Sequence, residues 1–280
     1  LLISKKIVMQ KYLFKVFSLL LFIPIFINSQ LLQSDVPWND DETGYYTIKN
    51  NNIVLVSATG DDDKIILPAL KTKNLKIESF VFSTSKNKVL LFTNSVKVWR
   101  YRTRGDYFVY DFQKENIYQI GKNLPDSSLM FAKFSPDENY VAYVSKEKSQ
   151  NSNRNSTTKA NIFLENLNNN SIKKLTSSEG TDKLINGTFD WVYEEEFSCR
   201  DGFLFNEDGT KIAFWQVDAN QVKDFYMINN TDSIYSSTIP VEYPKVGEPV
   251  TPVKIGVIDL ESEKITWMNV GNLEEEFYLP

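Results

Sequence analysis

The sequence contains no histidine and a single cysteine, Cys199. A Ser-His-Asp or Cys-His nucleophilic centre needs an imidazole that exchanges a proton near neutral pH, so this chain cannot assemble one from its own residues. The same scarcity excludes histidine-ligated metals, cysteine-based metal clusters and an intrachain disulfide. Chemistry on this chain is therefore limited to carboxylate, Lys, Tyr or Ser groups, or it takes place on another segment, and we expect no cofactor.

An excess of positive charge is absent as well. Lys and Arg number 31 against 36 Asp and Glu, which gives a formal net charge of -5. Because a nucleic-acid-binding surface needs a basic field to hold phosphates, we expect no nucleic acid partner. Of the 280 residues, 42% are hydrophobic and 14% aromatic, which is enough apolar material for a large packed core.

A long apolar run occurs only near the N-terminus. It covers residues 16–27, follows Lys11 and Lys15, and ends in small polar residues. A membrane span needs about 20 apolar residues, so this shorter run favours a secretory signal peptide. We therefore expect upstream residues plus a signal peptide over residues 1–30 and an exported protein, periplasmic or extracellular. The alternative is a membrane anchor formed by residues 16–27.

The rest of the chain consists of short runs with alternating apolar residues, separated by Asn, Asp, Gly and Ser. Residues 52–56 and 65–67, for example, flank a turn-rich segment at Gly60-Asp61-Asp62-Asp63. Such runs are typical of strands joined by hairpin turns. Helical periodicity never extends beyond about two turns, so the sequence predicts an all-β protein.

Two patterns recur along this part of the chain. The first is an aromatic residue, a small polar residue, a turn and a β-branched strand, and it starts at Phe82, Phe134 and Phe205. The second is a hairpin of two apolar strands, at residues 108–120, 162–175 and 257–268. One copy of each makes a four-stranded unit, and such units repeating at roughly 40–50 residues or more are typical of a β-propeller.

The second interval between these phenylalanines is longer than the first, which requires an insertion. Residues 145–159 form a polar candidate, and residues 182–199 form an acidic and aromatic one. At roughly 50 residues per blade the chain provides about five blades, too few to assume a closed ring. We therefore predict an incomplete ring of four-stranded blades over residues 31–280, with a flat sandwich as the structural alternative.

The acidic insertion contains the run D-W-V-Y-E-E-E from Asp190 to Glu196. Asp190 can cap a short helix, and a solvated acidic helix start is the plainest interpretation of the run. Three adjacent carboxylates repel one another, however, and in an aromatic setting they favour a bound cation. A peptide's charged α-amino group is one candidate, and a metal ion is a weaker one because a short run supplies few ligands. Adjacent helical residues face different directions, so their convergence would require a distorted turn.

This acidic run and the segment Val96-Lys97-Val98-Trp99-Arg100 resemble motifs of the dipeptidyl peptidase IV family, within the prolyl oligopeptidase clan. Residues 225–229 and 243–245 resemble later family segments, and the order and spacing are similar from about residue 80 to 270. The resemblance is to the family's N-terminal propeller. It implies an exported serine exopeptidase that removes dipeptides from peptide N-termini, usually when the second residue is proline or alanine.

The resemblance also implies site residues. In the family the last two glutamates of the triplet bind the substrate's α-ammonium, which corresponds to Glu195 and Glu196. The arginine of the second motif binds a substrate carbonyl, which corresponds to Arg100. The expected partners are peptides with a free N-terminus, and a homodimer of the full-length protein is left open.

The family's nucleophile, acid and histidine lie in a C-terminal α/β-hydrolase domain, with the serine in a G-x-S-x-G elbow. This sequence has neither that elbow nor a histidine. We therefore expect a fragment truncated before the catalytic domain, which holds no catalytic residue and is inactive alone. The alternative is a non-catalytic propeller that acts as a peptide-binding or sensor module.

Overall fold

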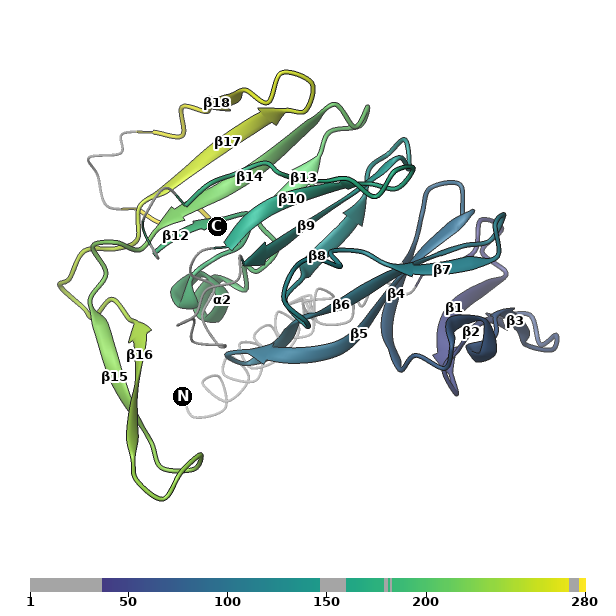
Figure 1. Cartoon of the computed structure of the whole chain (residues 1–280), viewed down its shortest axis with the longest axis horizontal. Coiled ribbons are helices and arrows are strands. Elements are labelled where there is room, and N and C mark those ends of the chain that lie inside the picture. The colour runs from purple at the N-terminus through teal and green to yellow at the C-terminus, as the bar shows by residue number, and fades with distance from the viewer. Residues whose placement is uncertain (1–36, 147–159, 179–180, 182, 272–276) are drawn as a thin grey trace, which may run out of the picture. The chain divides into compact units, whose positions relative to one another are not determined.

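The computed structural model describes residues 37–146, 160–178, 181, 183–271 and 277–280 (Figure 1). The expected signal peptide and most of the polar insertion at 145–159 lie outside the described residues. Two compact units can be distinguished: within the described residues the first comprises 37–47 and 54–64, and the second comprises 48–53 and the residues from 65 onward. The acidic run and Arg100 both belong to the second unit.

The N-terminal sheet has three strands in the order β1-β2-β3. They are β1 (Gly44–Lys49), β2 (Asn52–Ser57) and β3 (Lys64–Leu67), followed by the short 3-10 helix η2 (Ala69–Thr72). Asn50 and Asn51 connect β1 to β2 with φ angles of 52° and 61°. Two consecutive left-handed residues are what a tight hairpin turn requires, and asparagine tolerates this conformation better than most residues.

Two complete four-stranded antiparallel sheets follow, in the orders β4-β5-β6-β7 and β11-β10-β9-β8. The first contains β4 (Ile77–Phe82), β5 (Lys88–Val98), β6 (Tyr101–Asp111) and β7 (Asn116–Gln119). The second contains β8 (Met130–Phe134), β9 (Tyr140–Lys146), β10 (Ala160–Asn166) and β11 (Ile172–Lys174). Each sheet is thus formed by strands that are consecutive in the sequence, as in a propeller blade.

These two sheets are the first and second blades, and the next sheet, the third blade, has the same meander with additions. Its four successive neighbours in the sheet are β13 (Phe203–Phe205), β14 (Lys211–Asp218), β17 (Val253–Asp259) and β18 (Ile265–Trp267). A further strand, β12 (Leu184–Asn186), pairs with the far half of β14, beyond the half that pairs with β13. The separate hairpin of β15 (Asp224–Asn229) and β16 (Ser237–Glu242) is inserted between β14 and β17.

The small polar residue of the recurrent pattern closes the turn between the first two strands of each blade. The Ser83 hydroxyl accepts from Lys88 N at 3.1 Å, and the Ser135 hydroxyl accepts from Tyr140 N at 3.0 Å. In the third blade the Asn206 side chain takes the same place and accepts from Lys211 N at 2.8 Å. The repeat predicted from the sequence is therefore confirmed as a repeated hydrogen bond.

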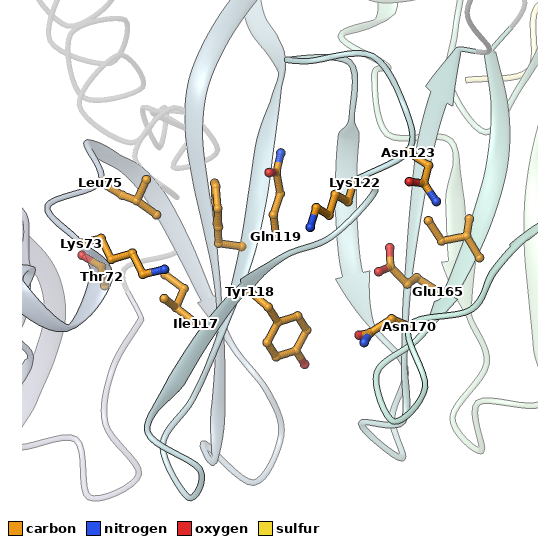
Figure 2. Close-up of a pocket in the computed structure, with 12 residues that line it drawn as sticks. Thr72, Lys73, Leu75, Ile117, Tyr118, Gln119, Lys122, Asn123, Glu165 and Asn170 are labelled. Carbon is orange, nitrogen blue, oxygen red and sulfur yellow. The ribbon is translucent and has the colours of Figure 1, made fainter.

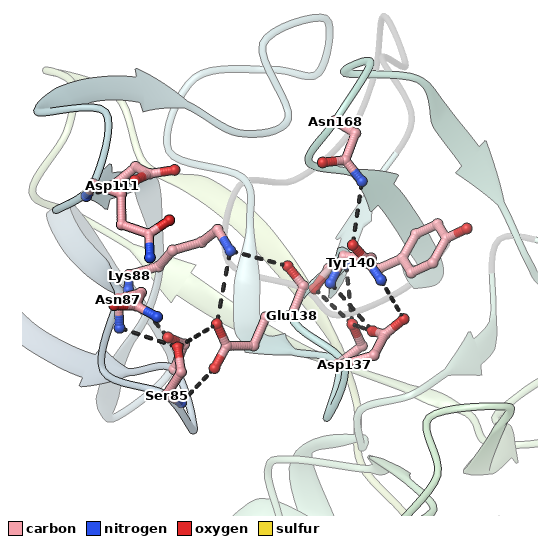
Figure 3. A network of polar contacts seen from close by, with 12 residues as sticks. Ser85, Asn87, Lys88, Asp111, Asp137, Glu138, Tyr140 and Asn168 are labelled. Atoms are coloured by element: carbon pink, nitrogen blue, oxygen red, sulfur yellow. Dashed lines mark hydrogen bonds and ion pairs between the residues drawn. The ribbon is translucent and has the colours of Figure 1, made fainter.

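Neighbouring blades are also tied together at these turns (Figure 3). The Glu138 carboxylate accepts from Ser85 N at 2.5 Å and from the Ser85 hydroxyl at 2.8 Å. Lys88 Nζ lies 3.7 Å from the same carboxylate. Burial alone would raise the pKa of Glu138, but the hydrogen bonds from Ser85 outweigh it and lower the pKa. The charged form of Glu138 thus links the first blade to the second.

The hydrophobic core lies between successive sheets. Val141 and Tyr143 of β9 pack in one cluster with Leu90 of the preceding blade. The alternate β9 residue Val144 belongs to a second cluster that contains Phe214 of the following blade. Because successive residues of a strand point to opposite faces, the β8–β11 sheet buries both of its faces. A two-layer sandwich would bury only one face of each sheet, so the propeller-type arrangement is the one observed.

The prediction of an all-β protein with four-stranded blades is confirmed. No closed ring of blades is found within the described residues, as expected for an incomplete propeller. The one α-helix in the described part of the chain is α2 (Trp191–Phe197), in the acidic insertion. No described helix is both long and apolar enough to cross a membrane.

Candidate functional site

Helix α2 lies between β12 and β13, the two strands that share β14 as a partner. Its N-cap is Asp190, whose Oδ1 accepts from Tyr193 N at 3.1 Å, which confirms the capping role predicted from the sequence. The other oxygen, Oδ2, accepts from the Thr251 hydroxyl at 2.6 Å. Thr251 precedes β17, so this single carboxyl group both starts the helix and anchors it to the third blade.

Aromatic side chains hold the remaining faces of the helix. Tyr193 is fully buried and stacks on Phe189, with ring centroids 5.3 Å apart. Its hydroxyl accepts from Leu279 N at 2.9 Å. Trp191 packs on Tyr243, with centroids 4.7 Å apart. A helix of only seven residues is unstable by itself, so this packing is what keeps the acidic run in place.

The three glutamates differ in burial. Glu194 is 5% exposed, the Glu195 side chain is 11% exposed, and Glu196 is exposed. The helix is continuous through Phe197, and the left-handed residue Ser198 (φ 58°) ends it. The distorted turn expected for convergence of the carboxylates is therefore not present. The glutamate side chains instead extend from a regular helix in different directions. Glu194 is directed inward and Glu196 lies at the surface.

Arg100 lies in the tight turn between β5 and β6, where Trp99 has a φ angle of 48°. Its Nη2 atom lies 2.5 Å from Glu195 Oε2. The structure thus brings together the two motifs that the sequence singled out, although they are far apart in the chain. Because the Arg100 side chain is 68% exposed, the pair contributes modestly to stability and the arginine is accessible to a ligand. Glu196 takes part in no ion pair among the described residues.

Sequence reasoning missed the role of burial at Glu194. Burial raises the pKa of its carboxyl group to about 7, the negative charge of Glu195 acts in the same direction, and Arg200 and Arg100 oppose the shift. Its Oε1 atom is buried and has no hydrogen-bond partner within the described part of the chain. The signal available in the sequence was the spacing of Asp190 and Glu194. Residues four positions apart lie on the same helical face, so Glu194 follows the helix cap toward the interior.

Two cavities bear on the location of a binding site. One of about 620 Å³ lies beside the C-terminal end of α2 and is lined by Cys199, Arg200 and Trp215 among others. The other, of about 530 Å³, is lined by residues that include Lys73, Lys122 and Glu165 and contains none of the acidic run (Figure 2). Among the described residues, no three acidic or cysteine side chains are grouped as ligands for a metal ion.

Comparison with known proteins identifies the family. The family model for the dipeptidyl peptidase IV (DPP IV) N-terminal region matches residues 83–279, which is more than half of the chain. The chain belongs to the dipeptidyl peptidase IV family. Both motifs of the site, the D-W-V-Y-E-E-E run and the V-K-V-W-R segment, lie within the matched range. The resemblance inferred from the sequence is thereby confirmed.

Named relatives of the family share this region of the sequence. Dipeptidyl aminopeptidase B of Saccharomyces cerevisiae is 28% identical over 257 residues, which cover 82% of this chain and 29% of the relative. Dipeptidyl peptidase 4 of Felis catus is 27% identical over 230 residues, which cover 80% of this chain and 28% of the relative. The chain thus spans less than a third of the length of these dipeptidyl peptidases.

A solved structure shares the fold. The crystal structure of Porphyromonas gingivalis dipeptidyl peptidase 4 superimposes with a TM-score of 0.70 at 21% identity, over 83% of this chain and 32% of that protein. At this identity the match supports the arrangement of the blades and no more. The assignment of substrate contacts to Glu195, Glu196 and Arg100 stays a prediction.

Proposed function

We propose that this chain is the substrate-recognition propeller of an exported serine-type dipeptidyl aminopeptidase. The enzyme releases Xaa-Pro or Xaa-Ala dipeptides from the N-termini of peptides. The hydrolysis itself belongs to a separate α/β-hydrolase domain with a Ser-Asp-His triad. Membership of the dipeptidyl peptidase IV family supports this proposal, as do the names of the relatives.

In this proposal Glu195 and Glu196 bind the α-ammonium group of the substrate, and Arg100 binds a backbone carbonyl. The observation that supports it best is the 2.5 Å ion pair between Arg100 and Glu195, because it places a cation and a carboxylate from different elements side by side. A peptide's N-terminus presents an ammonium donor and a carbonyl acceptor within one residue. Paired donor and acceptor groups of the protein at short distance match that pattern.

The same arrangement explains how a fixed number of residues is removed. A carboxylate pair at a fixed distance from a nucleophile admits a chain only up to its charged end, so the position of the cut is set by geometry. A peptide with an acetylated N-terminus has no positive charge and would leave both carboxylates unpaired. We therefore expect the enzyme to reject it.

The test uses the full-length protein and a Gly-Pro chromogenic substrate. Replacing Glu196 by alanine should lower kcat/KM by about 30-fold or more, because a bound substrate covers this exposed carboxylate and loss of one partner from a desolvated charged pair costs on the order of 2–5 kcal/mol. Glu207→Ala is the matched control, since Glu207 is exposed in the turn between β13 and β14. Unchanged kcat/KM in the Glu196 variant would show that the ammonium is bound elsewhere. Absence of any turnover by the wild type would favour the peptide-binding or sensor module instead.

A further inference from the structure

The Glu194 carboxyl group has no assigned role in the proposed contacts, and the fold gives it little support. The residue is 5% exposed. Its Oε1 atom has no hydrogen-bond partner among the described residues. A buried oxygen of this kind costs free energy, whereas an apolar side chain of similar size would fill the position without that cost. Such a group in a native structure calls for an explanation.

Charged groups from three segments act on Glu194. They are Glu195 in the same helix, Arg100 from the turn between β5 and β6, and Arg200 from the segment after the helix. Arg100 is already paired with Glu195 at 2.5 Å, and the Arg200 guanidinium lies 3.9 Å from the centre of the Tyr101 ring. Neither arginine forms a direct ion pair with Glu194 within the described residues. Glu194 therefore lies in the field of two arginines and of Glu195, but among the described residues it has no direct ion-pair partner.

The other titratable groups around the helix are accounted for. Asp190 accepts hydrogen bonds from Tyr193 N and the Thr251 hydroxyl. The Tyr193 hydroxyl is bonded to Leu279 N, and Tyr278 packs edge-on against the Tyr193 ring. Cys199 is half-buried, and burial raises the pKa of its thiol. None of these groups supplies a positive charge that could neutralise Glu194.

We propose that Glu194 is a positioning residue of the amine site, which loses its proton when a substrate ammonium arrives and so provides a third negative charge in the acidic run. This inference rests on the proposed function, because it requires the ammonium to bind at Glu195 and Glu196. The proton passes to solvent, and no bond other than O–H is broken.

The direction of the effect follows from electrostatics. In the free protein, burial and the charge of Glu195 keep the pKa of Glu194 at about 7. An ammonium group nearby favours the charged carboxylate and lowers this pKa. Binding therefore releases a proton near pH 7, and the affinity for the charged ammonium form of the peptide rises with pH. The rise between pH 6 and pH 8 is up to about tenfold when the pKa falls well below 6 in the complex.

The experiment measures proton release when the dipeptide Ala-Pro binds the full-length protein. Calorimetric titration at pH 7 in phosphate and in Tris, buffers of different ionisation enthalpy, gives the number of protons exchanged. We expect the wild type to release about half a proton more than Glu194→Gln, since the group is half protonated at its pKa. Glu207→Gln should match the wild type, and Glu194→Asp should retain part of the release. The peptide's own amine titrates alike in all four proteins and cancels in the comparison.

The outcomes separate this inference from the proposed function. If Glu194→Gln binds Ala-Pro and releases as many protons as the wild type, Glu194 is not the titrating group and the inference fails while the amine site stands. If the wild type binds N-acetyl-Ala-Pro as tightly as Ala-Pro, or binds neither, the amine site itself is absent and both proposals fail. A melting curve of Glu194→Gln like that of the wild type at pH 5 establishes that the variant is folded.

Discussion

At the scale of single residues, the structure separates three glutamates that are alike in the sequence. Glu196 is solvated, Glu195 is paired with Arg100, and Glu194 is buried with an unbonded oxygen. Charge pattern alone predicts solvation for all three. Burial depends on how the helix packs against segments that are distant in the sequence, from which Thr251, Leu279 and Tyr243 contact it. The family resemblance assigned Arg100 and Glu195 to one binding site, but their ion pair was not predicted.

The burial of Glu194 predicts a pH-dependent stability that can be measured without substrate. An unfolded glutamate has a pKa of about 4.3, whereas the folded value is about 7. Because the folded pKa is raised, the associated stability is fully present below pH 4.3 and is lost as the pH rises through 7. Glu194→Gln, which cannot ionise, should therefore gain roughly 3–4 kcal/mol relative to the wild type at pH 8 and about 1 kcal/mol at pH 5. Thermal melting at both pH values measures this, and a difference that does not change with pH would contradict the assignment.

At the scale of secondary structure elements, the features that could be predicted from the sequence are those formed by residues close together in the chain. The turns after Phe82, Phe134 and Phe205 were predictable because a small polar side chain closes each of them within the turn itself. The cap at Asp190 was predictable for the same reason. The sequence did not predict that β12 and β13 pair with different halves of β14. It also did not predict the separate β15–β16 hairpin. Alternating apolar residues indicate a strand, but they do not say which strand is its partner.

The anchoring of helix α2 gives a prediction at this scale. Asp190→Ala removes both the helix cap and the partner of Thr251, and it should destabilise the protein by about 1–2 kcal/mol. Asp190→Asn keeps an N-capping oxygen without the charge, and since burial raises the pKa of Asp190, the neutral side chain should cost less than half as much. Urea denaturation measures the free energy of unfolding of both variants, provided that their m-values equal that of the wild type. Equal losses in the two variants would show that the charge, rather than the cap, secures the helix.

At the scale of the whole molecule, the β8–β11 sheet lies between two neighbouring blades and helps to hold the acidic helix in place. The β8–β11 sheet packs on both faces, and Gly187, just before the helix, fits against it only because it lacks a side chain. Its φ angle is 76°, and an added Cβ would lie 2.6 Å from Ile162 Cγ1. The segment that leads into helix α2 is therefore held by a close contact between the second and third blades.

The proposed separation of substrate recognition from hydrolysis predicts how this chain behaves alone. It has no histidine and no G-x-S-x-G elbow, and it spans 29% of the yeast relative. The purified chain should release no dipeptide from a Gly-Pro chromogenic substrate, because binding an ammonium supplies no nucleophile. Full-length protein assayed in parallel is the positive control, and the same protein with Glu196→Ala defines the contribution of the propeller. Turnover by the rigorously purified chain would mean that its carboxylate, Lys, Tyr or Ser groups perform the hydrolysis, and the division of labour proposed between propeller and hydrolase domain would be wrong.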